Sequence, residues 1–74
     1  MYKIGQKVRV RPNNDNENYD EFRGKTLIVE AIYTSDKQNR FYDSSMKGMQ
    51  LLEFITETGE YVPYALYEYE IRPI

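Results

Sequence analysis

The polar and apolar positions of the chain alternate most strictly near its start, over residues 6–11. Val8 and Val10 occupy one face of this segment, and three cations, Lys7, Arg9 and Arg11, occupy the other. A period of two is typical of a half-buried β-strand. Because Pro12 has no backbone N–H to donate, the strand is expected to end there. We therefore predict a first strand over residues 6–11.

Two later segments also have the composition of strands. Residues 26–34 are a β-branched and aliphatic run whose two faces are both partly apolar, which is typical of a bent strand that serves two sheets. Residues 49–56 predict a third strand, and residues 57–60 are short, polar and contain Gly59, as a tight hairpin requires. We expect residues 61–63 to pair with the strand before this hairpin. Residues 65–67 should form one helical turn, and residues 69–72 should form the last strand.

The two longest segments between these strands differ in how clearly their composition indicates a structure. Residues 13–20 are rich in Asn and Asp, which favour turns, so we expect a long, hydrated and mobile loop. Residues 35–48, which contain Phe41 and Tyr42, have no pattern that predicts one structure. The pattern predicts a core from the following residues: Val8, Val10, Ile28 or Val29, Ile32, Leu51, Phe54, Val62 and Ile71.

Composition limits the size and setting of the protein. With 74 residues, of which 41% are hydrophobic and 30% charged, the chain has enough apolar material for one small core, and we expect a single domain over residues 1–74. There is no cysteine, so the domain has no disulfide framework, which favours a cytoplasmic protein. No segment has the length and apolarity of a signal peptide or a membrane span, so we expect no membrane partner.

Charge is distributed unevenly, although the net charge is only −2. The first eleven residues contain four cations and no acid, whereas residues 15–21 and the glutamates after residue 52 are acidic. A general polyanion-binding protein would have an excess of positive charge, so this balance argues against that class.

Three short motifs resemble those of small β-barrels. Gly5-Gln6-Lys7-Val8 is similar to the Gly-x-x-Val entry of such barrels, including the KOW modules of ribosomal and transcription proteins. Gly24-Lys25-Thr26-Leu27-Ile28-Val29 resembles the KOW core, with Leu27 in place of its second glycine. Gly59-Glu60-Tyr61-Val62-Pro63 resembles the Gly-x-x-Val-Pro segment of Src-homology-3 domains. As a whole, the chain is also similar to a small prophage protein, which implies a phage setting and supplies no activity.

The resemblance of the three motifs to small β-barrels implies an all-β fold, a small five-stranded antiparallel Src-homology-3-like barrel with one short helical turn. The peptide-binding residues of that family do not carry over. Tryptophan is absent, and Leu66 stands where those domains have a tyrosine three residues after the Val-Pro proline, with Tyr67 one place late.

The residue types also bear on catalysis and on metal binding. Without histidine or cysteine, the chain lacks the common general base, the thiolate nucleophile and the usual zinc ligands, so we expect no enzyme and no cofactor. Asn13, Asp15, Glu17 and Asp20 are spaced like oxygen ligands. However, an EF-hand loop that begins at Asn13 would need glycine at position 18 and glutamate at position 24, where this chain has Asn18 and Gly24. A turn-rich loop without metal is therefore favoured.

Two surfaces are candidates for binding. Lys7, Arg9 and Arg11 could follow successive phosphates of a nucleic acid, or they could be a solvated face with cross-strand partners such as Glu30 or Glu70. Tyrosines crowd the C-terminal segment, and there we expect Tyr61 and Tyr69 to be structural and Tyr64 and Tyr67 to be exposed.

From these observations we expect a non-catalytic interaction module, a phage-type accessory protein that binds a protein or peptide. The predicted contacts are Tyr19, Phe22, Pro63, Tyr64 and Tyr67. The first alternative is a KOW-like nucleic-acid-binding barrel that uses Lys7, Arg9 and Arg11. The second is a structural subunit of a larger assembly.

Overall fold

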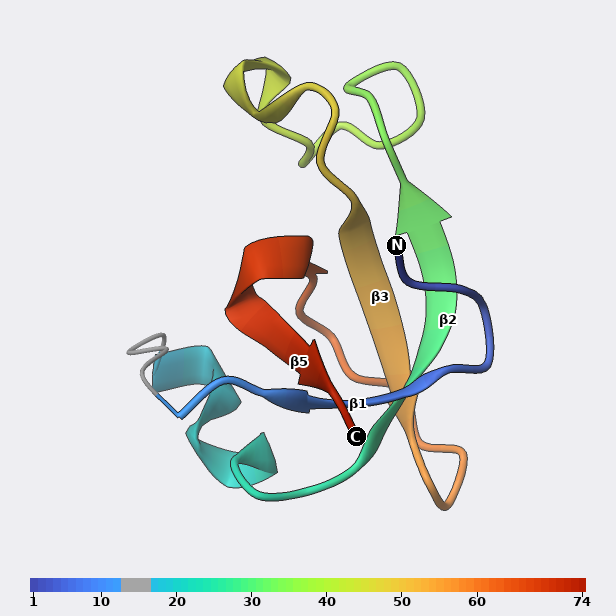
Figure 1. The fold of residues 1–74 in the computed structure, drawn as a ribbon, viewed down its shortest axis with the longest axis vertical. Coiled ribbons are helices and arrows are strands. Elements are labelled where there is room, and N and C mark those ends of the chain that lie inside the picture. Colours follow the sequence, from blue (N-terminus) through green and yellow to red (C-terminus); the bar gives the residue numbers. More distant parts are fainter. Residues whose placement is uncertain (13–16) are drawn as a thin grey trace.

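The strands of the protein form one antiparallel sheet in a computed structural model, which describes residues 1–12 and 17–74 (Figure 1). They are β1 (Lys7–Val10), β2 (Leu27–Tyr33), β3 (Leu51–Thr56), β4 (Leu66–Tyr67) and β5 (Ile71–Pro73). Between them, the described part of the chain forms three short 3₁₀ helices: η1 (Glu17–Phe22), η2 (Ser44–Met46) and η3 (Glu68–Glu70). The strand order is β4-β3-β2-β1-β5, so the chain is all-β and the described sheet is open between β4 and β5.

The first three strands confirm the predictions made from the apolar pattern. In β1, Val8 and Val10 are buried as the alternation requires. β2 pairs with β1 on one side and with β3 on the other. Its register with β3 shifts between Val29 and Ala31, and such a bulge bends a strand. The bend explains why both faces of β2 are partly apolar (Figure 1).

The hairpin after β3 also forms as predicted. The Gly59 N–H donates to the Thr56 carbonyl, and the Thr56 N–H donates to the Glu60 carbonyl. Gly59 has a φ of 86°, in the left-handed region that glycine adopts without steric cost. This turn therefore depends on the absence of a side chain at residue 59.

The predicted order of elements after the hairpin was wrong. Residues 61–63 form only an isolated bridge from Tyr61 to Ile55 in place of a strand, because Pro63 has no N–H to continue the ladder. β4 forms instead at Leu66–Tyr67, where the helical turn was expected, and it pairs with the start of β3. The helical turn, η3, follows three residues later than predicted and leads into β5.

The segment between β1 and β2 is more ordered than its polar composition predicted. Residues 13–16, which include part of the predicted mobile loop and of the disfavoured calcium site, lie outside the described residues. Residues 17–22, however, form η1. Tyr19 and Phe22 on this helix are buried, with ring centroids 5.9 Å apart. A loop without structure was therefore the wrong expectation for residues 17–20, because two aromatic side chains anchor the segment to the core.

The segment between β2 and β3 is held by one buried tyrosine. The Tyr42 hydroxyl donates to the carbonyls of Met46 and Met49, both at 2.6 Å, and burial raises its pKa. Asp43 caps η2 by accepting from the Ser45 N–H, which lowers the Asp43 pKa. These local bonds explain how a segment with little apolar pattern becomes structured.

The core lies on the inner face of the sheet and is closed by η1. It contains the following buried residues: Val8, Val10, Tyr19, Phe22, Leu27, Val29, Leu52, Phe54, Val62, Leu66 and Ile71. Most of the predicted core is confirmed, with Val29 the buried member of its pair and Ile32 only partly buried against the cluster. Within the described part of the chain, no helix has the length and apolar character needed to cross a membrane.

Candidate functional site

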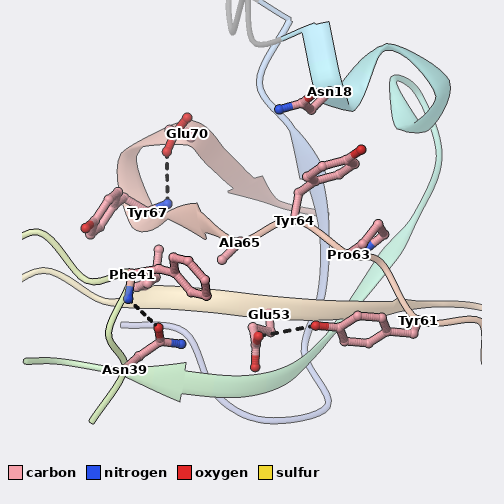
Figure 2. A pocket seen from close by; sticks show the side chains of 11 residues that line it. Asn18, Asn39, Phe41, Glu53, Tyr61, Pro63, Tyr64, Ala65, Tyr67 and Glu70 are labelled. Carbon is pink, nitrogen blue, oxygen red and sulfur yellow. Dashed lines mark hydrogen bonds between the residues drawn. The ribbon is translucent and has the colours of Figure 1, made fainter. Parts of the chain in front are cut away.

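A groove with a volume of about 350 Å³ lies on the outer side of β3 and β4 (Figure 2). Its lining comes from η1, from the segment between β2 and β3, from β3 itself, and from the segment that runs from the hairpin to η3. The lining residues are Asn18, Asn39, Phe41, Leu51, Glu53, Tyr61, Pro63, Tyr64, Ala65, Tyr67 and Glu70. The groove therefore gathers aromatic side chains that are distant in sequence.

Tyr64 is positioned by the core residue beneath it. The Tyr19 hydroxyl donates to the Tyr64 carbonyl, and the two rings lie 5.8 Å apart with a tilt of 59°. Burial raises the pKa of Tyr19 well above that of a free tyrosine. The neighbouring Pro63 is exposed and has no N–H to satisfy. This wall of the groove is therefore preformed, with 38% of Tyr64 left accessible.

Tyr67 is fixed from several sides. The Asp43 N–H donates to the Tyr67 hydroxyl at 2.7 Å, and the Tyr42 ring packs edge-on against the Tyr67 ring at 5.6 Å. Tyr69 stacks on its other side, with centroids 6.3 Å apart and an interplanar angle of 6°. The Tyr67 N–H donates to the Glu70 carboxylate. Because its ring and backbone are both held, Tyr67 is a rigid part of the groove.

Phe41 contributes the most exposed aromatic ring of the groove. It is 74% exposed, although most phenylalanine side chains are buried. Its backbone is fixed because the Phe41 N–H donates to the Asn39 side chain at 2.8 Å. The guanidinium carbon of Arg40 lies 4.9 Å from the Phe41 ring centroid, a cation–π distance. A large apolar surface is thus held out toward solvent.

Glu53 supplies a carboxylate to the groove from the middle of β3. Its Oε1 accepts from the Tyr33 hydroxyl at 2.7 Å. Its Oε2 accepts from the Tyr61 hydroxyl, 3.5 Å away, and the Tyr61 hydroxyl points toward Glu53 in Figure 2. The hydrogen bond to Glu53 is the main cause of the raised pKa of Tyr33. No lysine or arginine nitrogen of the described residues lies within 4.0 Å of Glu53. The groove therefore presents a negative charge without an ion-pair partner.

The structure brings together three of the five predicted contacts, Pro63, Tyr64 and Tyr67. Tyr19 and Phe22 were wrong as accessible contacts, because η1 turns both into the core, where they are 0% and 8% exposed. Tyr19 supports the groove from the core, because its hydroxyl donates a hydrogen bond to the Tyr64 carbonyl.

Two other expectations about aromatic residues were also wrong. Tyr61 and Tyr69, expected to be structural, are 61% and 54% exposed. Sequence reasoning missed Phe41 and Glu53. Alternation in β3 could have placed Glu53 on the outer face, but no pattern in residues 35–48 marked Phe41 as the exposed member of the Phe41-Tyr42 pair.

The basic face of β1 extends onto β5. Lys7 and Arg11 are exposed and Arg9 is half-buried, and Arg9 lies directly opposite Arg72. Among the described residues, no acidic group comes within 4.0 Å of Lys7, Arg9, Arg11 or Arg72. Glu30 and Glu70, named as possible cross-strand partners, therefore form no ion pair with this face. A shallow hollow beside Arg9 is lined by further residues of both signs: Lys25, Glu57 and Glu60.

The described residues contain no group of three or more acidic side chains placed to hold a metal ion. No protein-family model, curated protein or solved structure matches the chain.

Proposed function

We propose that this protein is a small non-catalytic interaction module that binds an extended segment of another protein in the aromatic groove. The observation that carries the proposal is the convergence of Phe41, Tyr61, Tyr64 and Tyr67 on one hollow, with Phe41 74% exposed. Exposed aromatic rings around a concave surface are typical of protein-binding sites, where a few such residues supply most of the binding energy.

The rigidity of the groove supports the same function. Tyr64 and Tyr67 are held by bonds and ring contacts to Tyr19, Tyr42 and Asp43. A preformed site loses little conformational entropy when it binds, so more of the contact energy appears as affinity. The lack of histidine and cysteine supports a role without catalysis.

We further propose that the sheet is of the Src-homology-3-like kind. The support is the order of elements: a long connection after β1, a tight hairpin after β3 and a single 3₁₀ turn, η3, that leads into β5. Five antiparallel strands in the order β4-β3-β2-β1-β5 are consistent with it.

Nucleic-acid binding through Lys7, Arg9 and Arg11 is the second candidate, and the pairing of Arg9 with Arg72 is the observation in its favour. The face is not uniformly basic, however, because Glu57 and Glu60 line the hollow beside Arg9. With a net charge of −2, long-range attraction of a polyanion would be weak. The aromatic groove, whose charged lining residues among those described are Glu53 and Glu70, favours a protein ligand over a nucleic acid.

Selection from a random peptide library against the purified protein would test this function. Selected peptides should bind with an affinity that falls about fivefold or more in Phe41→Ala and Tyr64→Ala, because removal of a central aromatic contact costs more than about 1 kcal/mol. Ile4→Ala is the matched control, since Ile4 is 62% exposed and lies outside the groove. Peptides whose affinity is unchanged by both groove variants would refute the proposal.

A further inference from the structure

The outer face of the sheet, opposite the core, separates its charges. The charged residues of β1 and β5 are all cations: Lys7, Arg9 and Arg72. Those of β2 and β3 are both acids, Glu30 and Glu53. We propose that this face is the contact surface of a homodimer, in which a second copy of the chain packs face to face and the cations of each copy meet the acids of the other.

The strand register fixes where these charges lie. Lys7 pairs with Ile28, and Ile28 pairs with Ile55, so the three side chains form a central row across the outer face. Arg9 lies two residues beyond Lys7 on β1, and the exposed Glu30 lies two residues beyond Ile28 on β2. Because the two strands are antiparallel, Arg9 and Glu30 are each about 7 Å from the central row, on opposite sides of it.

The charges on the two sides of the central row have no counterpart within the chain. Arg9 lies directly opposite Arg72, and like charges in this position destabilise a sheet. The Arg9 Nε is buried and has no hydrogen-bond partner among the described residues. Glu57 and Glu60 line the hollow beside Arg9, but neither carboxylate comes within 4.0 Å of its guanidinium. No cation of the described residues comes within 4.0 Å of the Glu30 carboxylate either, so both signs of charge are available to a second copy.

A twofold axis along the central row makes the face complementary to itself. Rotation by 180° about this axis turns the second copy face to face with the first and exchanges the two sides of the row. Arg9 of each copy then lies within about one strand spacing, about 4.8 Å, of Glu30 of the other. Ile28 and Ile55, which are only half-buried in the single chain, meet their own counterparts at the centre. The dimer therefore combines an apolar centre with charge pairs on both sides.

Charge complementarity selects a second copy over other occupants of this face. A polyanion would be attracted by Arg9 and Arg72 and repelled by Glu30 and Glu53, and a protein surface of one sign would satisfy only one side. A copy of the same face carries both signs at matching distances from the row. Lys7 lies within the row, and its flexible stem lets the ammonium group turn toward the acids of the other copy.

The association state of the purified chain tests the dimer. Sedimentation equilibrium is measured from about 10⁻⁵ to 10⁻³ M protein, a range that covers weak association. The variants are Arg9→Glu and Glu30→Arg, each measured alone and in an equimolar mixture. Arg9→Glu places an opposite charge beside Arg72, so the single chain should stay folded, and circular dichroism checks this. Lys37→Glu is the matched control, because Lys37 is an exposed cation in the connection between β2 and β3.

We expect the wild type to dimerise with a dissociation constant on the order of 10⁻⁴ M, as for a small and partly charged interface. Each charge reversal should weaken the dimer about tenfold or more, because two attractive contacts of the symmetric dimer become repulsive. The equimolar mixture regains both contacts and should associate within about threefold of the wild type, as should Lys37→Glu. A wild type that is monomeric at about 10⁻³ M, a dimer that survives both reversals, or a mixture that stays monomeric would overturn the dimer.

A groove variant shows that the contact is on the outer face and not in the aromatic groove. Phe41→Ala should leave the dissociation constant of the dimer within about twofold of the wild-type value, because Phe41 lines the groove and lies outside the five strands. Loss of association in Phe41→Ala would place the contact in the groove and overturn the proposed face.

Discussion

Replacement of Tyr19 by phenylalanine should destabilise the protein by an amount that one buried hydroxyl group sets. The substitution keeps the buried ring and removes one hydroxyl, which donates to the Tyr64 carbonyl across 45 positions of sequence. A lost hydrogen bond that leaves a part-buried acceptor costs about 1–2 kcal/mol at neutral pH. With a urea m-value of about 1 kcal/mol/M, the unfolding midpoint should fall by about 1–2 M.

The same substitution should change how stability depends on pH. Burial raises the pKa of Tyr19 above the ordinary value of 10.0, so the folded protein keeps a proton that the unfolded chain releases. The contribution of the buried hydroxyl is therefore fully present below pH 10 and is lost as the pH rises above it. The free energy of unfolding falls by about 1.4 kcal/mol for each pH unit from this one group.

Tyr19→Phe lacks this group, whereas the raised pKa values of Tyr2, Tyr33 and Tyr42 affect wild type and variant alike. The stability advantage of the wild type should therefore disappear within about one to two pH units above 10. Urea unfolding followed by circular dichroism, at a series of pH values from neutral to alkaline, measures both curves. A stability difference that stays constant throughout the alkaline range would show that the Tyr19 hydroxyl does not keep its proton in the folded protein.

Four further predictions concern other parts of the molecule. Gln50→Leu should lower the free energy of unfolding by about 1–3 kcal/mol, because the buried amide bonds both the N–H and the carbonyl of Tyr2; an unchanged urea midpoint would contradict this. Gly59→Ala should cost about 1–2 kcal/mol by the same assay, since its φ of 86° is unfavourable for other residues. Phe41→Ala should change stability by less than about 0.5 kcal/mol, because the ring is mostly exposed. Oligonucleotides in about 0.15 M salt should bind no more tightly than about 10⁻⁶ M, and tighter binding that Arg9→Glu abolishes would favour nucleic acid as the ligand.

The parts of the fold that the sequence predicted are those where local pattern and tertiary packing agree. In β1, alternation alone identifies Val8 and Val10 as buried, and the hairpin follows from its polar residues and Gly59. The position of β4 could not be predicted from the sequence pattern. Leu66 and Tyr67 become a strand because they meet the start of β3, a contact that local composition does not encode.

The groove was predicted only in part for a related reason. Pro63, Tyr64 and Tyr67 lie close together in sequence, so their clustering was visible as aromatic density. Phe41 reaches the same place through the connection between β2 and β3, which is organised by the hydrogen bonds of Tyr42 and Asp43. Tyr19 was misplaced because a polar segment around it concealed that one face of η1 packs on the core.

Mapping where a selected peptide binds would show whether the aromatic groove is the binding surface. Amide shifts of the labelled protein are recorded during titration with the tightest library peptide. Binding in the groove should confine the large shifts to it, at Phe41, Glu53, Tyr61, Tyr64 and Tyr67. Large shifts along Lys7 to Val10 on β1, with the groove unperturbed, would contradict it.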